Sequence, residues 1–189
     1  MSWVKTILSY TGRFFYKVTN WDFEPLPEYF LDKHVIVGFP HTTNIDTIRA
    51  FFGFRIVKRT GHIMIKKEWF FWPFSVVFKA LGGIPVYRDS PQGVVGQMVD
   101  MFEQREKFLL AIVPEGTRRG VTTIKTGFWH IAKEADVSII CWYLDNDHKI
   151  TRWLGEVIPG EDKVEDMLKI QKIYDDAGYQ FPLDVSKIN

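Results

Sequence analysis

Hydrophobic residues recur along the chain with two alternating periods. Short apolar runs typical of buried strands occupy residues 35–39, 62–65, 84–87, 108–113 and 137–143, with a further short strand near 153–157. Helical spacing is found at residues 46–54, 69–81, 94–104, 126–134 and 162–177. Strands and helices thus alternate, which predicts an α/β fold: a single domain with a largely parallel sheet covered by helices on both faces.

The first twenty residues carry a pattern of their own. Trp3, Ile7, Tyr10, Phe14 and Val18 follow one another at intervals of three and four, which predicts an amphipathic helix over residues 3–18 with an aromatic stripe. We therefore divide the chain into this N-terminal helix, residues 1–20, and a single domain, residues 21–189. Two interpretations of the helix stay open: its stripe lies in a membrane interface, or the helix is an ordinary N-terminal helix that packs on the domain.

Residues between these segments predict further local features. Residues 22–33, with Pro25 and Pro27, predict a loop. Residues 69–74 hold five aromatic side chains in six positions, which suits a buried helix, an acyl-chain groove or a lipid interface. We expect core packing for this segment.

Composition narrows the class of protein. At 189 residues and a formal charge of +1, the chain has room for one core and no global preference for nucleic acid. The stretch 49–67 nevertheless contains six cations and no acid: Arg49, Arg55, Lys58, Arg59, Lys66 and Lys67. Such a stretch suits a phosphate-bearing surface, either an anionic membrane or a phosphorylated cofactor, and equally suits a solvated helix face.

Other residue types predict where the protein works. The one cysteine, Cys141, lies in an apolar run, which predicts a buried structural thiol in a reducing compartment. The longest apolar stretch, residues 70–78, is too short to span a membrane, and the N-terminus does not resemble a signal peptide, so we expect a cytoplasmic protein. The five histidines are scattered without metal-ligand spacing, so we expect no metal site.

Polar motifs follow three of the predicted strands. His41 and Asp46 come after the first strand, and a carboxylate that orients a histidine and stabilises its imidazolium makes that histidine an effective base. Arg88 follows the strand at 84–87, and the run Pro-Glu-Gly-Thr-Arg at 114–118 follows the strand at 108–113. All three motifs fall beyond carboxyl ends of strands, the edge at which open α/β sheets bind ligands.

In this order, the motifs resemble those of the PlsC-like glycerolipid acyltransferases, the lysophosphatidic acid acyltransferase family, in a short form without a transmembrane segment. The resemblance covers roughly residues 35–144. It rests on His-x₄-Asp with Thr43 as the hydroxyl residue, on the apolar strand ending in Arg88, on Pro-Glu-Gly-Thr-Arg letter for letter, and on Lys125-Thr126-Gly127. It implies the glycerolipid-acyltransferase-like fold, with the motif loops gathered at one mouth.

The resemblance also implies an activity and roles for single residues. The activity is O-acyl transfer from acyl-CoA or acyl-carrier protein to a hydroxyl of a lysophospholipid-like acceptor. His41 and Asp46 form the general-base dyad. The remaining motif residues bind the acceptor or add positive charge: Arg88, Glu115, Gly116, Thr117, Arg118 and Lys125.

The mechanism and partners follow from the same reading. The chain has no Gly-x-Ser-x-Gly elbow, so we expect direct transfer without an acyl-enzyme. No bound cofactor is expected. The expected partners are the lipid acceptor, the acyl donor and the anionic surface of a membrane, with the protein peripheral on its cytoplasmic face.

The chain departs from the family pattern at three places. Pro40 replaces the usual Asn before the histidine, the stretch between Arg118 and Lys125 is short, and Ser138 stands where a Pro normally opens the fourth motif. We expect these departures to affect the acceptor side of the site. Two other functions remain open: a phosphoester-handling enzyme, and a peripheral lipid-binding module without catalysis.

Overall fold

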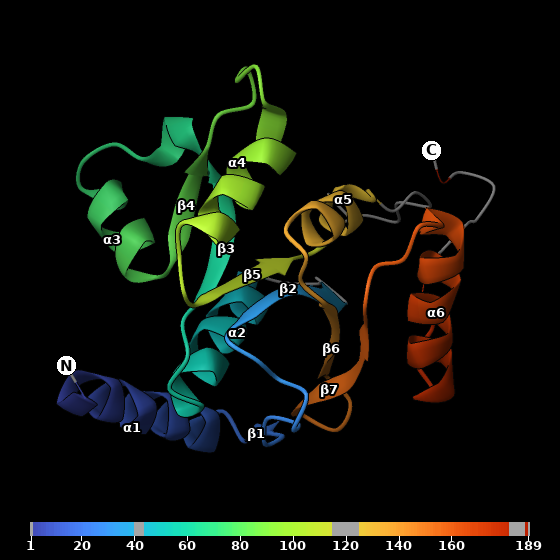
Figure 1. Ribbon diagram of the computed structural model, residues 1–189. Coiled ribbons are helices and arrows are strands. Elements are labelled where there is room, and N and C mark those ends of the chain that lie inside the picture. The colour runs from blue at the N-terminus through green and yellow to red at the C-terminus, as the bar shows by residue number, and fades with distance from the viewer. Residues whose placement is uncertain (1, 40–43, 115–124, 182–187, 189) are drawn as a thin grey trace.

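A seven-stranded sheet forms the centre of the computed structural model, which describes residues 2–39, 44–114, 125–181 and 188 (Figure 1). The strands, in chain order, are β1 (Asp22–Phe23), β2 (Lys33–Phe39), β3 (Gly61–Lys66), β4 (Gly83–Val86), β5 (Phe108–Ile112), β6 (Ile139–Asp145) and β7 (Ile150–Val157). In space they lie in the order β1-β7-β6-β2-β5-β3-β4, and every neighbouring pair is parallel except β6 and β7. The predicted, largely parallel α/β sheet is confirmed.

Helices cover both faces of this sheet (Figure 1). They are α1 (Ser2–Val18), α2 (Asn44–Ile56), α3 (Phe74–Ala80), α4 (Gly93–Glu103), α5 (Gly127–Glu134) and α6 (Lys163–Asp176), with a 3₁₀ turn, η1 (Lys67–Trp69). One core cluster joins the sheet to α4, α5 and α6, and the other joins it to α1 and α2. In β2, Val35 and Val37 enter the first cluster and Ile36 the second, so a strand buried on both faces is a continuous apolar run.

Helix α1 packs on α2 through its small and polar face. The Ser9 hydroxyl donates a hydrogen bond to the Ile56 carbonyl at 3.0 Å, and a Cβ at Gly12 would lie 2.7 Å from the Phe52 carbonyl oxygen. The opposite face is exposed and carries the α1 stripe: Ile7, Tyr10, Phe14 and Val18. The helix therefore packs on the domain, while the described stripe residues face away from it. Contact of the stripe with a membrane stays a prediction.

The segment 69–81 differs from the predicted single helix. A 3₁₀ turn ends at Trp69, and α3 begins only at Phe74, directly after Pro73. Proline restricts the residue before it away from helical backbone angles and lacks the N–H of a helix interior, which separates the two pieces. The expected core packing is also wrong: in η1 and α3, both described throughout, no residue is buried, and Trp72 is 82% exposed.

Two smaller features complete the fold. The predicted loop at 22–33 begins with the two residues of β1, which pair with Ile150 and Thr151 of β7. No helix in the described ranges has the length and apolar character needed to cross a membrane.

Candidate active site

The strands that lead into the three motifs end at one level of the sheet. Ala111 of β5 pairs with Ile36 of β2 and with Ile63 of β3, so three residues further on these strands are again level. There Lys66 of β3 pairs with Val86, the last residue of β4. Adjacent strands lie about 4.8 Å apart, so the chain leaves β2 and β4 about 14 Å from each other along one edge.

Several predicted site residues lie outside the described residues. These are His41, Glu115, Gly116, Thr117 and Arg118, together with the departure at Pro40. The elements that flank these residues are described. β2 ends at Phe39, before His41, and α2 begins at Asn44, after it. β5 ends at Ile112, before the motif that starts at Pro114.

Lys125 is placed at the same edge by a backbone contact. Its N–H donates a hydrogen bond to the Pro114 carbonyl at 3.2 Å, so the two residues that flank the segment 115–124 lie side by side. The Lys125 side chain is exposed. The predicted acceptor-side cation is therefore available at the carboxyl end of β5.

Asp46 lies in the first turn of α2 and is only 2% exposed. The Arg49 guanidinium donates a hydrogen bond to its Oδ1 at 3.1 Å, one turn further along the helix. Arg49 in turn lies over the Trp21 ring at 4.1 Å, and its carbonyl accepts a hydrogen bond from the Tyr16 hydroxyl at 3.0 Å. The carboxylate is thus fixed by residues from α1, α2 and the segment between α1 and β1.

This arrangement changes the interpretation of the basic stretch 49–67. Arg49, 15% exposed, is bound to Asp46, and Arg59 is paired with Asp32. Arg55 is half-buried over the Phe51 ring. Half of the six cations therefore hold the fold together, while the exposed ones are Lys58, Lys66 and Lys67. The spacing of three between Asp46 and Arg49 on a helix was the signal that sequence reasoning missed.

Arg88 is exposed just beyond β4, beside a pocket of about 720 Å³ between the η1 segment and α4. Gln97 of α4 fixes the preceding backbone, because its amide accepts from the Tyr87 N–H at 3.0 Å and donates to the Tyr87 carbonyl at 2.7 Å. Lys67 lies over the Tyr87 ring at 4.5 Å. Among the described residues, no ion pair joins Arg88 to its neighbour Asp89, so the guanidinium is available to a ligand.

An apolar pocket of about 280 Å³ lies on the α2 face of the sheet. It is lined by side chains and backbone of α2, β3 and β5, and by the residue after α3: Thr47, Ile48, Ala50, Phe51, Phe52, Phe54, Gly61, Ile63, Leu81 and Ala111. The same helix carries Asp46 in its first turn. An apolar chain held here would extend along α2 from the carboxyl edge.

Ser138 lies at the other edge of the sheet, which corrects the expectation that it affects the acceptor. Its carbonyl accepts a hydrogen bond from the Val35 N–H in the first half of β2, about 13 Å from the carboxyl end of that strand. The Ser138 hydroxyl accepts from His34 Nδ1 at 2.7 Å, and His34 Nε2 accepts from the Leu31 N–H at 2.6 Å. Ser138 therefore completes the hydrogen bonding of the buried His34 ring.

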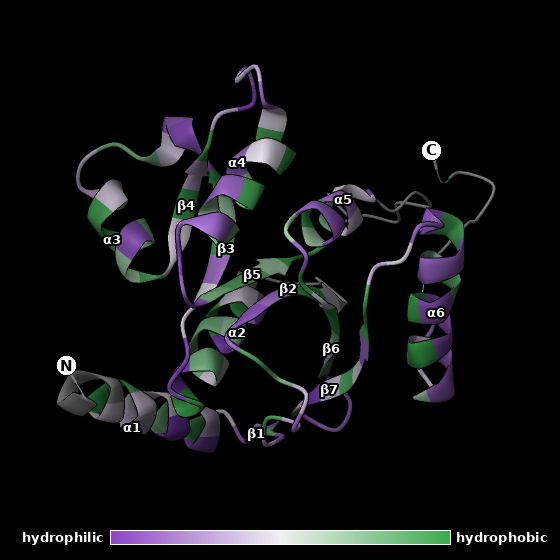
Figure 2. Cartoon of the chain, in the orientation of Figure 1, coloured by the Kyte–Doolittle hydropathy of each residue, from purple (hydrophilic) through white to green (hydrophobic). Residues whose placement is uncertain are grey.

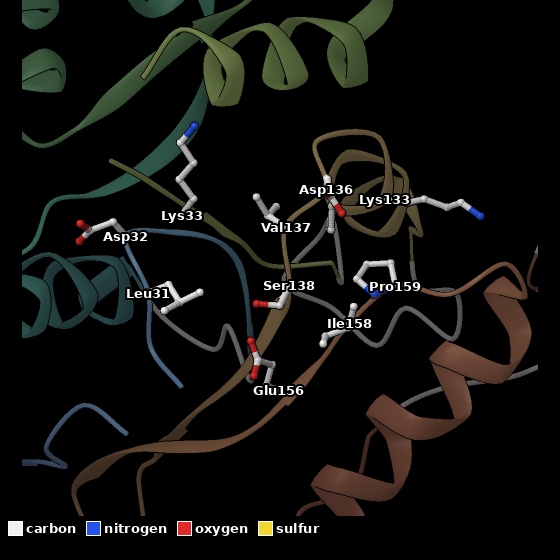
Figure 3. Close-up of a pocket in the computed structure, with 11 residues that line it drawn as sticks. Leu31, Asp32, Lys33, Lys133, Asp136, Val137, Ser138, Glu156, Ile158 and Pro159 are labelled. Carbon is white, nitrogen blue, oxygen red and sulfur yellow. The ribbon is translucent and has the colours of Figure 1, made fainter. Parts of the chain in front are cut away.

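This amino edge has a pocket of its own, of about 450 Å³. Figure 3 shows Ser138 and Glu156 within it, while the amino groups of Lys33 and Lys133 point outward. Those amino groups are already used: Lys33 donates to the Phe102 carbonyl at 2.7 Å and Lys133 to the Gly160 carbonyl at 2.9 Å.

The remaining reactive groups are buried or dispersed. Cys141 is buried, and burial raises the pKa of its thiol to about 12, so the predicted structural thiol is confirmed. Burial lowers the pKa of His62 to about 4, helped by the positive charge of Arg105. In the part of the chain that the structure describes, no three His, Cys, Asp or Glu side chains are grouped to hold a metal ion.

Comparison with known proteins is consistent with this geometry. A family model described as Acyltransferase matches residues 18–144. A search of curated proteins finds no match. Among solved structures, the fold is similar to that of the 1-acyl-sn-glycerophosphate (LPA) acyltransferase PlsC from Thermotoga maritima, with a TM-score of 0.64 and 16% identity over 93% of this chain and 78% of that one.

Proposed function

The chain belongs to the acyltransferase family, and from that premise we propose that it moves a fatty acyl group from acyl-CoA or acyl-carrier protein to a hydroxyl of a lysophospholipid-like acceptor. The observation that carries the proposal is the common level at which β2, β4 and β5 deliver the motif segments. The similarity to a structure titled as an LPA acyltransferase supports the choice of acceptor class.

The proposed chemistry is one direct displacement at the thioester carbonyl. The acceptor hydroxyl attacks the carbonyl carbon while His41 takes the hydroxyl proton, because a neutral alcohol is a poor nucleophile. The C–S bond then breaks, and the thiolate leaves as a thiol with the proton returned by His41. Products are the acylated acceptor and free CoA or carrier-protein thiol.

Asp46 would orient His41 and stabilise the imidazolium. Its position five residues after the histidine, in the first turn of α2, supports this role. Arg49 acts as a positioning residue, because its guanidinium holds Oδ1 of Asp46 and limits how the carboxylate can turn. Such support behind a catalytic pair keeps it in the reactive geometry.

Binding of the acceptor is assigned to the other motif residues. The exposed Arg88 guanidinium offers a planar fork of donors that suits a phosphate. Glu115, Gly116 and Thr117 would complete the headgroup site, with Arg118 and Lys125 adding positive charge. The apolar pocket beside α2 supports a place for an acyl chain within reach of the same edge.

We also propose that the protein works as a peripheral protein on the cytoplasmic face of a membrane. The exposed α1 stripe supports this, because Arg13 and Lys17 of the same helix are also exposed, and an amphipathic helix with cations beside its apolar face binds anionic interfaces. Replacing Ile7 and Phe14 with serine tests the stripe better than deleting the helix, because deletion also removes the buried Tyr16.

Thiol release tests the function directly. Purified protein is given an acyl-CoA or an acyl-carrier protein, with and without lysophosphatidic acid, and free thiol and acylated lipid are measured. We expect thiol release that depends on the acceptor and is lost in His41→Ala. Release at the same rate without acceptor, or acylated product from folded His41→Ala at the wild-type rate, would contradict the proposal.

A further inference from the structure

The segment between β3 and β4 forms a second exposed apolar surface, separate from the α1 stripe. We name it the α3 patch; its seven exposed side chains are Trp69, Phe71, Trp72, Phe74, Val76, Val77 and Leu81. Figure 2 shows hydrophobic positions along α3, which lies at the outer flank of the sheet beyond β4. Seven exposed apolar side chains within thirteen residues, two of them tryptophans, indicate an interaction surface.

The α3 patch is an ordered surface. Within it, the Phe71 and Phe74 rings lie 5.1 Å apart between centroids. Phe70 and Phe78, half-buried in the same segment, lie 5.7 Å apart. Behind it, α3 is held close to the sheet, because a Cβ at Gly83 would lie only 2.9 Å from the Phe78 carbonyl oxygen. The exposed rings are therefore presented by a supported element.

The segment that carries the patch has an excess of positive charge. Over residues 66–81 there are three lysines, Lys66, Lys67 and Lys79, and one acid, Glu68, and all four side chains are exposed. Tryptophan, with an apolar ring and a polar N–H, is favoured at the boundary between lipid headgroups and acyl chains. Exposed lysines beside such rings match the charge of anionic headgroups.

The patch lies next to the motif strands. It follows Lys66, which is level with the carboxyl ends of β2, β4 and β5. The tryptophans come directly after that level, before α3 runs back along the sheet to Gly83. A bilayer that receives the tryptophans would therefore face the carboxyl edge.

We propose that the α3 patch inserts into the interface of an anionic phospholipid bilayer and turns the carboxyl edge of the sheet toward the lipid. This rests on the proposed membrane association and names the surface responsible. The protein would thus contact the membrane at two surfaces: the α1 stripe, and the α3 patch, which orients the site toward the lipid.

Vesicle binding by matched variants tests the patch. Trp69→Ser/Trp72→Ser is compared with Leu31→Ser/Ile158→Ser, which removes two equally exposed apolar side chains elsewhere. On mixed phosphatidylcholine–phosphatidylglycerol vesicles without acceptor lipid, we expect the tryptophan variant to bind about ten-fold more weakly or worse and the control to bind like the wild type. Equal affinity of all three proteins would overturn the proposal.

A label at Val76 shows what the patch touches. Val76→Cys and, as control, Ile158→Cys are coupled to an environment-sensitive fluorophore; the native thiol of Cys141 is buried and stays unlabelled. We expect a blue shift at position 76, and quenching by brominated lipid, only with anionic vesicles. An aqueous spectrum at position 76 on vesicle-bound protein would overturn the proposal.

The same label separates lipid from a protein partner. A blue shift that depends on protein concentration without vesicles would show a second copy of the chain on the patch and would also overturn the proposal. Thermal unfolding checks that each variant is folded. Because these vesicles contain neither acceptor nor acyl donor, the binding and fluorescence results do not depend on whether the protein transfers acyl groups.

Discussion

The two edges of the sheet carry the same kinds of polar side chain and use them differently. At the amino edge, both ring nitrogens of His34 are hydrogen-bonded, and Asp32 pairs with Arg59 and Lys107. At the carboxyl ends of β4 and β5, Arg88 and Lys125 are exposed, and among the described residues neither forms an ion pair. These polar groups at the amino edge hold elements together, whereas Arg88 and Lys125 at the carboxyl edge are available to a ligand.

The largest effects on turnover and on stability should come from replacing each of two histidines, His41 and His34, with alanine. His41→Ala should lower turnover by about 10²–10⁴ with little change in stability, since it removes a base. His34→Ala should do the reverse, because it removes a buried ring that links Leu31 to Ser138. Steady-state kinetics measure the turnover of both variants, and urea unfolding measures their stability. If His34→Ala lost turnover while keeping full stability, the amino edge would not be purely structural.

Asp46 should combine both kinds of effect. Its position at the edge alone predicts that Asp46→Asn folds normally, but its burial against Arg49 predicts a stability loss of about 1–3 kcal/mol in addition to reduced turnover. The turnover loss should be smaller than that of His41→Ala, since the base remains. A double-mutant cycle with Arg49→Met checks the coupling, and additive unfolding free energies would show that the pair does not matter.

His62, near the amino edge, should make the fold sensitive to acid. Burial lowers its pKa to about 4 in the folded protein, against about 6.5 when unfolded, so the unfolded chain binds the proton first as pH falls. Its stabilising contribution is complete above pH 6.5 and is lost between pH 6.5 and 4. Allowing for partial solvent access, the loss should be about 2 kcal/mol. In His62→Phe, the unfolding free energy should fall less over this range; identical pH profiles would refute the assignment.

Arg88→Lys should have a more modest effect. The substitution keeps the charge but loses the planar fork of donors, so the KM for a phosphorylated acceptor should rise about ten-fold while kcat changes little. An acceptor without a phosphate serves as control, because its KM should not respond. Unchanged kinetics with both acceptors would give Arg88 a structural role.

The smallest effect should come from Ser138→Ala. Loss of the hydrogen bond from His34 should lower the unfolding free energy by about 1 kcal/mol without altering turnover or acceptor preference. The measurement is the relative rate with a set of acceptors for the wild type and the variant. A changed order of acceptors would show that the amino edge influences the active site.

The sequence predicted the centre of the sheet well, because β2, β5 and β6 are largely buried on both faces and therefore stand out as apolar runs. The carboxyl ends of β2, β4 and β5 carry the motifs, and this common edge could be expected from alternating strands and helices alone. The hydrophobic pattern does not give the register between neighbouring strands. Whether Ser138 lies beside Phe39 or beside His34 depends on which residues of β2 and β6 pair, and packing of the whole sheet decides that pairing.

The helices show the same difference between pattern and context. The α1 stripe was recognised, but its periodicity does not reveal that the helix packs through Ser9 and Gly12 instead. The α3 patch was expected in the core because aromatic residues are usually buried; its composition is equally suited to lipid. The sequence pattern grouped Arg49 with the surface cations. In the structure, its guanidinium binds the Asp46 carboxylate one helical turn away and lies over the Trp21 ring.

The hydrogen bond between Lys125 and Pro114 gives the segment 115–124 a closed base on the sheet. Once the ends of a segment are held, doubling its length costs only about 0.6 kcal/mol in closure entropy. Evolution can therefore lengthen, shorten or replace this segment as a unit while β5 and α5 keep their places. If the segment binds the acceptor as proposed, acceptor choice can change through this one segment, without a new fold and without moving β5.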